Sequence, residues 1–387
     1  MPIHIRAVES SKDLHDFVTF PWRVYGDDPL WVPPLIGDEK KLLTPGKHPF
    51  YEHGSVQCFL AEAPDRSGRP RPAGRIAAIR NRNHESFHEE AVGFFGFFEA
   101  LPTSGHLERE GLAGVRPEEV TEALMDAARR WTRDQGLPVI RGPLNPSTNE
   151  TCALLVEGFD DPPQIMMPYN PREYAGLLEG AGLRKAKDLL AYRADAALIP
   201  DSLIRRAETA AERTGVTVRS LVMKDLRAEV ERVQDVYNAA WEKNWGFVPM
   251  TPAELDHMAA ELKHIVEPDL VCFAEKEGRV IGFGLALPDY NQALRHANGR
   301  LFPFGLLKIL WHKRDINRLR VLALGVLAEY RRMGIDQLMY LTLWRNGKRL
   351  NYREGEFSWV LEDNMPMRVA AERLGGAVYK TYRIYEG

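Results

Sequence analysis

The sequence predicts a mixed α/β fold with two domains, each built on a central, mostly antiparallel mixed sheet flanked by helices. The chain has 387 residues, which suits two domains. Strand-like and helix-like stretches intermix along it and do not separate into blocks. A similar pattern also occurs twice, half a chain apart. An asparagine, a helical stretch, a glycine and an extended segment with aromatic residues run from Asn170 through Gly182 and again from Asn364 through Gly376. These observations favour two domains of one topology.

The first expected domain covers residues 1–196. Its extended segments are "IHIRAV", "SVQCFLAEA", "GRIAAIRN", "AVGFFGFFEA" and "PVIRGPL", and a helix is expected over residues 117–136. "HESFH" (84–88) matches the spacing of a zinc-binding helix. It lies between two strand-like segments, is short, and has no third ligand after it. We therefore expect a polar hairpin loop there and no metal site.

The second expected domain covers residues 197–387. Residues 216–222 are strand-like, and helices are expected over 225–244 and 251–265, the latter opened by the Thr251, Pro252, Glu254 signature. Residues 270–288 predict a hairpin that turns at Glu277-Gly278. A strand at 318–326, a helix, a strand at 356–361, a second helix and a strand at 377–385 complete the domain.

Composition excludes several classes of protein. The formal net charge of −3 gives no basic field for nucleic acid. Three cysteines lie far apart and predict neither a disulfide framework nor a metal pair, so we expect a cytoplasmic protein. The N-terminal residues show no signal-peptide pattern. The longest strongly apolar run, residues 301–311, is too short to span a bilayer, so we expect no stable membrane insertion.

The stretch "GVLAEYRRMGIDQLM" (325–339) carries the first candidate site. Gly325 interrupts an apolar strand and predicts a β-bulge. The next residues, Arg331, Arg332 and Gly334, lead into a helix N-terminus, where unpaired N–H groups and the helix dipole favour a pyrophosphate. An ordinary surface turn with two solvated arginines would show the same residues, so both interpretations stay open at this point.

Strand, "GVLAEYRRMGID", long helix, strand, "LEDN", short helix and "LGG" together resemble the GNAT superfamily of acetyltransferases. The resemblance covers residues 216–387 well, and the first half resembles a divergent second copy, as in tandem-GNAT proteins. It implies acetyl-CoA, or another acyl-CoA, as co-substrate. The residues that would bind it are Leu324, Gly325, Val326, Arg331, Arg332, Met333, Gly334, Ile335, Asp336 and Asn364.

Three features depart from the family pattern. Asp336 replaces a small residue of the phosphate loop, and Ala371 stands where many members have a tyrosine that protonates the leaving thiolate. That proton donor is therefore unassigned, with Tyr379, Tyr382 and Tyr385 on the following strand. The first half has no equivalent arginine–glycine loop and places glutamates at its helix entry, so we expect a scaffold without a catalytic site.

Amine attack on a thioester requires a base, because an alkylamine is protonated at neutral pH. The strand 318–326 has no carboxylate, whereas "EFSWVLEDN" contains Glu356, Glu362 and Asp363. We choose Glu362 as the catalytic base and expect Asp363 to cap the next helix. Backbone N–H groups around Leu324 to Val326 would stabilise the oxyanion.

The amine acceptor is expected to contact two segments. Trp245 and Phe247 would form an apolar wall, and Asp289, Tyr290 and Asn291 would emerge at a strand end. The connection over residues 287–314 is too long for a simple hairpin, which indicates a functional or flexible segment. Its stretch "GLLKILWHKR" suits either an interfacial amphipathic helix or, as we favour, a helix packed on its own domain.

The sequence thus predicts an acyl-CoA-dependent N-acyltransferase, most simply an N-acetyltransferase, acting on a small-molecule or peptide amine. A Fem-like transferase that uses aminoacyl-tRNA has the same architecture but needs no pyrophosphate loop. A regulatory protein that binds an acyl-CoA without turnover is the third hypothesis. The acceptor, the acyl length and the oligomeric state do not follow from the sequence.

Overall fold

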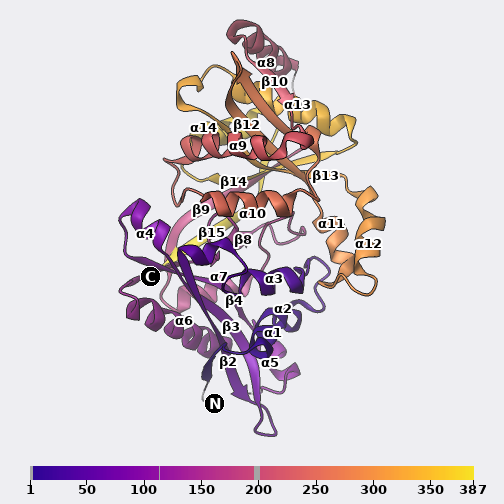
Figure 1. Ribbon diagram of the computed structural model, residues 1–387. Coiled ribbons are helices and arrows are strands. Elements are labelled where there is room, and N and C mark those ends of the chain that lie inside the picture. Colours follow the sequence, from indigo (N-terminus) through magenta and orange to yellow (C-terminus); the bar gives the residue numbers. More distant parts are fainter. Residues whose placement is uncertain (1–2, 113, 196–200) are drawn as a thin grey trace. The chain divides into compact units, whose positions relative to one another are not determined.

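The computed structural model describes residues 3–112, 114–195 and 201–387. The chain packs into two compact units, whose elements are labelled in Figure 1. Unit 1 comprises Met1–Asp188, Leu294–Leu307 and Tyr382–Gly387, and unit 2 comprises Leu189–Ala293 and Lys308–Thr381. The expected boundary between residues 196 and 197 lies outside the described residues. The halves 1–196 and 197–387 therefore stay a prediction.

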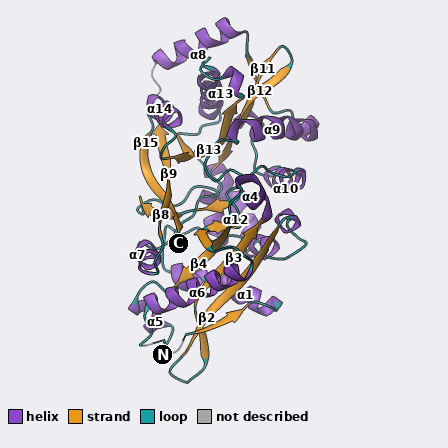
Figure 2. Ribbon diagram, turned by 90° about the vertical axis from the view of Figure 1, so that its left-hand side faces the viewer, coloured by secondary structure: helices purple, strands orange, loops and turns teal. Residues whose placement is uncertain are grey.

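Unit 1 is a strand-rich layer with helices packed on it (Figure 2). Its elements are β1 (His4–Ala7), α1 (Ser11–Thr19), α2 (Pro21–Tyr25), α3 (Ile36–Leu42), β2 (Gly54–Pro64), β3 (Pro70–Asn81), α4 (Arg82–His88), β4 (Val92–Ala100), α5 (Ser104–Arg109), α6 (Pro117–Asp134), β5 (Val139–Gly142), β6 (Leu144–Asn145), β7 (Thr151–Cys152), β8 (Leu154–Glu157) and α7 (Glu173–Gly180).

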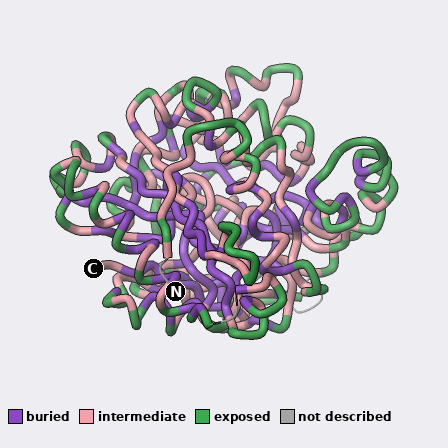
Figure 3. The backbone as a smooth tube through the Cα atoms, turned by 90° about the horizontal axis from the view of Figure 1, so that it is seen from below, coloured by how far each residue is buried: buried purple, intermediate pink, exposed green. Residues whose placement is uncertain are grey.

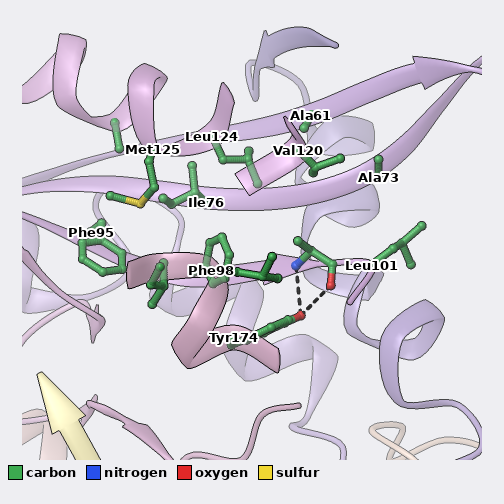
Figure 4. Packing of buried hydrophobic residues seen from close by; sticks show 14 of the residues in the cluster. Ala61, Ala73, Ile76, Phe95, Phe98, Leu101, Val120, Leu124, Met125 and Tyr174 are labelled. Atoms are coloured by element: carbon green, nitrogen blue, oxygen red, sulfur yellow. Dashed lines mark hydrogen bonds between the residues drawn. The ribbon is translucent and has the colours of Figure 1, made fainter. Parts of the chain in front are cut away.

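Strands β1, β2, β3 and β4 of unit 1 pair antiparallel in that order, and β4 pairs with β5 in parallel. A parallel pair needs a crossover, and α6 supplies it. The amphipathic α6 buries Val120, Leu124 and Met125 against β3, where Gly74 makes room because an added Cβ would lie 2.8 Å from Leu124. Figure 4 shows this core, together with Tyr174, whose hydroxyl accepts from the Ala100 N–H at 2.9 Å.

Unit 2 repeats this topology. Its elements are α8 (Asp201–Thr214), β10 (Thr217–Ser220), α9 (Leu226–Trp241), α10 (Pro252–Leu262), β11 (Val271–Lys276), β12 (Arg279–Pro288), β13 (Arg318–Val326), α13 (Ile335–Arg349), β14 (Glu354–Leu361) and α14 (Met365–Arg373). The connection from β12 to β13 contains α11 (Asn291–Leu294) and α12 (Gly305–His312). Strands β9 (Arg184–Asp195) and β15 (Ala377–Glu386) contribute residues to both units.

The sheet of unit 2 has the strand order β10, β11, β12, β13, β14, β9. All neighbours are antiparallel except β13 and β14, which run parallel and are connected through α13. Figure 3 shows the buried residues of the backbone in purple and the exposed residues in green. The fold is therefore the mixed α/β architecture that the sequence predicts.

Local signals in unit 2 identify their elements well. The turn between β11 and β12 falls at Glu277 and Gly278, both with positive φ as a tight hairpin requires. At α10, the Thr251 side chain accepts from the Glu254 N–H at 3.1 Å, and the Glu254 carboxylate accepts from the Thr251 N–H at 2.9 Å. Both predictions are confirmed.

The repeat that the sequence shows is real in topology, but its two asparagines have different roles. Asn170 is buried and holds β8 through the Leu155 N–H at 2.7 Å and the Leu155 carbonyl at 3.0 Å. Asn364 instead caps α14. The glycine that ends each helix with positive φ is Gly182 after α7 and Gly375, one residue before the expected Gly376, after α14. The repeat therefore aligns the helices and not each residue.

The hairpin loop expected at residues 84–88 is wrong, because these residues belong to helix α4. Asn81 caps this helix by accepting from the His84 N–H. An asparagine at this place indicates the start of a helix, and the spacing of the histidines does not include it. His84 and His88 lie one turn apart with ring centroids at 4.5 Å. Among the described residues, no three His, Cys, Asp or Glu side chains are grouped to hold a metal ion. Within the same residues, no helix combines the length and the hydropathy that crossing a membrane needs.

Candidate active site

The connection from β13 to α13 ends in a tight turn. Gly334 is the residue before the helix and has φ 83°, a conformation that glycine adopts without strain. The Arg331 guanidinium donates to the Val326 carbonyl at 3.2 Å and to the Ala240 carbonyl at 2.8 Å, so it ties the turn to β13 and α9. Arg331 and Arg332 are both exposed. The sequence assigned Arg331 to phosphate, whereas in this structure its donors hold the turn together.

Asp336 lies in the first turn of α13, where the sequence placed a phosphate. Burial raises the pKa of Asp336, while the backbone N–H groups of Gln337 and of Asp336 itself act in the opposite direction. Those N–H groups are the ones that a helix N-terminus offers to an anion. The carboxylate and a pyrophosphate would therefore compete for the same donors.

Gly325 is not the bulge that its place in the strand suggested. It lies in register opposite Phe283, and the register shift falls instead between Leu285 and Ala286, which leaves Leu322 as the extra residue. Gly325 has a packing role, since an added Cβ would lie 2.4 Å from the Trp241 ring on α9. Leu324 and Val326 also have ladder partners on β12. A bulge frees backbone groups, so free donors near the site are expected around Leu322.

Strands β13 and β14 separate in the middle of the sheet. Their parallel pairing runs from Arg318–Glu354 to Val321–Phe357 and stops there, although both strands, described throughout, continue. On the α13 side, Leu319 and Val321 pack beneath the helix together with Tyr340. Side chains alternate between the two faces of a sheet along each strand. Arg320 lies between Leu319 and Val321 and pairs with Glu356, so the side chains of Arg320 and Glu356 face away from α13.

A buried polar cluster occupies the point where these two strands separate. Arg320 and Glu356 are 1% and 0% exposed, although isolated charges are costly to bury. Arg320 Nε donates to Ser358 Oγ at 2.8 Å, and Ser358 Oγ donates to Glu356 Oε1 at 2.5 Å. The Tyr379 hydroxyl donates to the other carboxylate oxygen of Glu356. Every oxygen of this buried carboxylate is thus held by a neighbour.

Two further cations adjoin this cluster. Burial lowers the pKa of Lys380 to about 8, while the Glu356 carboxylate acts to raise it. The Arg193 guanidinium lies over the Tyr379 ring at 4.0 Å, which fixes the orientation of the ring. Tyr379 is half-buried, whereas Glu356 is fully buried. Tyr379 is therefore the member of the hydrogen-bonded chain through which a proton can reach Glu356 from outside.

The structure does not bring Glu362 into this cluster. Glu362 follows the last residue of β14, is half-buried, and its carbonyl accepts from Arg368 at 2.9 Å. Asp363 does not cap α14; Asn364 does, accepting from the Met367 N–H at 3.3 Å. The carboxylate with the arrangement expected of a base is Glu356, which the sequence pattern ranks below Glu362 because it lies early in the strand.

The predicted acceptor residues lie in two places. Asp289 and Tyr290 follow β12 and are buried, and the Asp289 carboxylate accepts from the Asn291 N–H at 3.3 Å. The Asp289 charge also acts to raise the pKa of Lys380. Phe247 is buried against Tyr237, with ring centroids 5.5 Å apart.

Sequence reasoning missed Arg320, Ser358 and Lys380, and it named Tyr379 without giving it a role. The available signal was a charge inside an apolar strand, at "RLRVLALGV" for Arg320 and at "AVYKTYRIY" for Lys380. A charged side chain on a central strand needs a partner, so each one predicts a buried polar group on a neighbouring strand. The register that joins Arg320 to Glu356 does not follow from periodicity.

Comparison with solved structures identifies the fold. A tandem GNAT protein from the clavulanic acid biosynthesis pathway superposes with a TM-score of 0.56 at 11% identity, over all of this chain and 98% of that chain. The fold is thus the tandem GNAT fold that the sequence resembles. No protein-family model matches the chain.

Two named relatives span nearly the whole chain. A protein named bacterial ceramide synthase, from Caulobacter vibrioides, is 35% identical over 394 residues, which cover 99% of this chain and 97% of the relative. Protein YghO of Escherichia coli K12 is 33% identical over 391 residues, with 99% and 94% covered. The chain belongs to the family of these two proteins.

Proposed function

We propose that this protein is an acyl-CoA-dependent N-acyltransferase whose active site lies in unit 2. The observation that carries the proposal is the buried Glu356 cluster at the point where β13 and β14 separate. The GNAT fold supports a thioester donor, and the α13 N-terminus with Gly334 is the place for its pyrophosphate. Binding there requires the Asp336 carboxylate to turn aside or to take up a proton.

The reaction begins with removal of a proton from the acceptor amine. Tyr379 takes that proton while passing its own to Glu356, because its hydroxyl already donates to this carboxylate. The amine nitrogen then forms a bond to the thioester carbonyl carbon and the carbon–sulfur bond breaks, while the extra proton that the nitrogen still carries passes to water, so that a neutral amide forms. Tyr379 returns the proton to the leaving thiolate and recovers its own from Glu356. This sequence gives the thiolate a donor that Ala371 cannot supply.

Arg320 and Ser358 position the carboxylate in this scheme. Arg320 lies opposite Glu356 in the parallel register, and Ser358 lies between them in the hydrogen-bonded chain. These contacts hold the carboxylate in one orientation, with one oxygen toward Ser358 and the other toward Tyr379. Arg320 and Ser358 need not touch either substrate.

We further propose that the acceptor is the amine of a long-chain amino alcohol and that the donor is a fatty acyl-CoA. A ceramide is the amide of these two components, and the relative named bacterial ceramide synthase is similar to this chain over nearly its full length. This proposal replaces the acetyl group as the first choice and keeps the amine attack.

The test is thiol release by the purified protein with acetyl-, octanoyl- or palmitoyl-CoA, each paired with sphinganine or with glucosamine. We expect release with palmitoyl-CoA and sphinganine, and mass spectrometry should find the N-acyl product. Release with glucosamine alone would contradict the lipid acceptor. Binding of acyl-CoA without release for any pair would favour the regulatory alternative.

A further inference from the structure

Helix α12 and the residues on either side of it form an exposed segment that is rich in apolar side chains. The α12 segment, residues 300–314, follows α11 in the connection drawn in orange in Figure 1. Phe302 is 80% exposed and Phe304 is 65% exposed. The other exposed large hydrophobic residues of the segment are Leu301, Leu306, Leu307, Leu310 and Trp311. Single exposed hydrophobic residues are normal on a protein, but a contiguous group marks an interaction surface.

The helix presents these residues in an ordered way. Gly305 and Ile309 are the buried residues of the helix. Leu306 and Leu310 are one turn apart, as are Leu307 and Trp311, so these four side chains cover one exposed side of α12. The expectation that this helix packs on its own domain stays a prediction, but most of its large apolar side chains are exposed.

The charge of the segment has one sign. Between Asp289 and Asp315 the chain has no aspartate or glutamate, and its charged residues there are Arg295, Arg300, Lys308, Lys313 and Arg314. Arg314 lies 3.9 Å from the centre of the Trp311 ring, so an aromatic side chain and a cation are presented together. Long basic side chains place an apolar stem against apolar surroundings and a charged end in water.

We propose that the α12 segment docks on the surface of a bilayer that contains anionic lipids. The apolar side chains enter the boundary between headgroups and acyl chains, and the basic residues bind the headgroup phosphates. A short helix with an apolar side and basic flanks is the form that such binding takes. A second copy of the chain fits less well, because pairing two such segments would bring like charges together.

Membrane docking stands apart from the proposed reaction, because it rests on the exposed surface and its charge alone. It is compatible with the expectation of no stable insertion, since docking at the surface needs no helix that spans the membrane. The protein would bind reversibly and in a manner that depends on salt.

The test is flotation of the full chain with vesicles of phosphatidylcholine, with or without phosphatidylglycerol, at low and at high salt. We expect flotation with phosphatidylglycerol vesicles that weakens at high salt. The double variant Leu310→Ser, Trp311→Ser should reduce partitioning by about tenfold or more, because two large apolar groups no longer enter the bilayer. Lys308→Glu with Arg314→Glu should reduce binding to anionic vesicles in particular.

Phe87→Ser is the matched control, since Phe87 is also an exposed aromatic residue but lies on α4. It should float as the unaltered protein does. Equal flotation of the Leu310, Trp311 double variant and the unaltered protein, or no flotation of either, would overturn the proposal. A dimer in light scattering without vesicles that the same double variant abolishes would assign the surface to self-association instead.

Discussion

Both units contain a parallel strand pair joined by a helix, β4–α6–β5 in unit 1 and β13–α13–β14 in unit 2. In unit 1 the chain after β5 continues into β6 and lies against β4. An added Cβ on Gly96 would be 1.7 Å from the Leu144 carbonyl oxygen, and Asn145 accepts the Phe97 N–H at 2.6 Å. In unit 2, β13 and β14 instead separate beyond Val321 and Phe357. In unit 1 the backbone of β6 thus occupies the place beside β4. In unit 2 the corresponding place, where β13 and β14 separate, is occupied by side chains.

The N-termini of the two connecting helices, α6 in unit 1 and α13 in unit 2, also differ between the units. Helix α6 begins at Pro117 after Arg116, its first turn carries Glu118 and Glu119, and the Glu119 carboxylate accepts from the Arg116 N–H at 3.3 Å. Helix α13 begins after Gly334 in a positive-φ conformation, with one acid, Asp336, in the first turn. A helix end already capped by its own carboxylates has little to offer a phosphate. One fold can therefore be kept as a scaffold in one copy and as a site in the other.

The largest expected effect is on the rate of acyl transfer. It distinguishes two buried carboxylates that each accept a hydrogen bond from tyrosine, Glu356 in unit 2 and Glu99 in unit 1. Glu356→Gln and Tyr379→Phe should each lower acyl transfer by about a thousandfold, because either change breaks the proton relay. The double variant should be no slower than the single ones, since both remove one step. Glu99→Gln in unit 1 should leave the rate unchanged. Steady-state thiol release measures all four, and an additive double variant would show that the two residues act separately.

Glu99 should contribute to the pH dependence of stability. Burial raises the pKa of Glu99 to about 7 from an ordinary value of 4.5. Between these values the folded protein binds a proton that the unfolded chain releases, so the free energy of unfolding falls as pH rises through this range. The loss is about 3 kcal/mol, at roughly 1.4 kcal/mol per pH unit. Urea unfolding at several pH values should show this slope in the difference between the unaltered protein and Glu99→Gln, because His84, whose pKa burial lowers to about 4, adds the opposite slope to both proteins; parallel curves would contradict it.

The turn before α13 gives a smaller effect. Arg331→Ala should weaken CoA binding by about tenfold, because the turn loses its ties to the Val326 and Ala240 carbonyls. Arg116→Ala, at the equivalent helix entry of unit 1, should leave CoA affinity unchanged. Calorimetry with CoA decides between the two. Equal affinity in both variants would remove the turn from the binding site.

The smallest expected effect is an increase in CoA affinity, opposite to the decrease expected for Arg331→Ala. Asp336→Asn should tighten CoA binding a few-fold at neutral pH, since a neutral side chain repels phosphate less. Glu118→Gln on α6 serves as the control and should change nothing. Weaker binding by the Asp336 variant would mean that the carboxylate supports the loop and does not compete with the ligand.

The sequence predicted the strands and helices of unit 2 closely, because turn and cap residues such as Gly278 and Thr251 act locally. It also located the loop of Arg331 and Gly334. It did not find the buried cluster, since Glu356 meets Arg320 through strand register and Tyr379 through a third strand, neither of which periodicity encodes. It placed the base at Glu362 because a strand end is where such residues often lie, and that choice stays a prediction beside Glu356.

The exchange of strand residues between the units has a consequence for how the chain can fold during synthesis. Tyr385 pairs with Gly142, and Gly387 exchanges two hydrogen bonds with Ile140, so the parallel strand β5 of unit 1 is completed by residues 382–387. These residues leave the ribosome after all the central strands of unit 2. While unit 2 is being synthesised, the sheet of unit 1 therefore has an unpaired edge at β5. An unpaired strand edge favours aggregation, and this is the stage at which a chaperone would act.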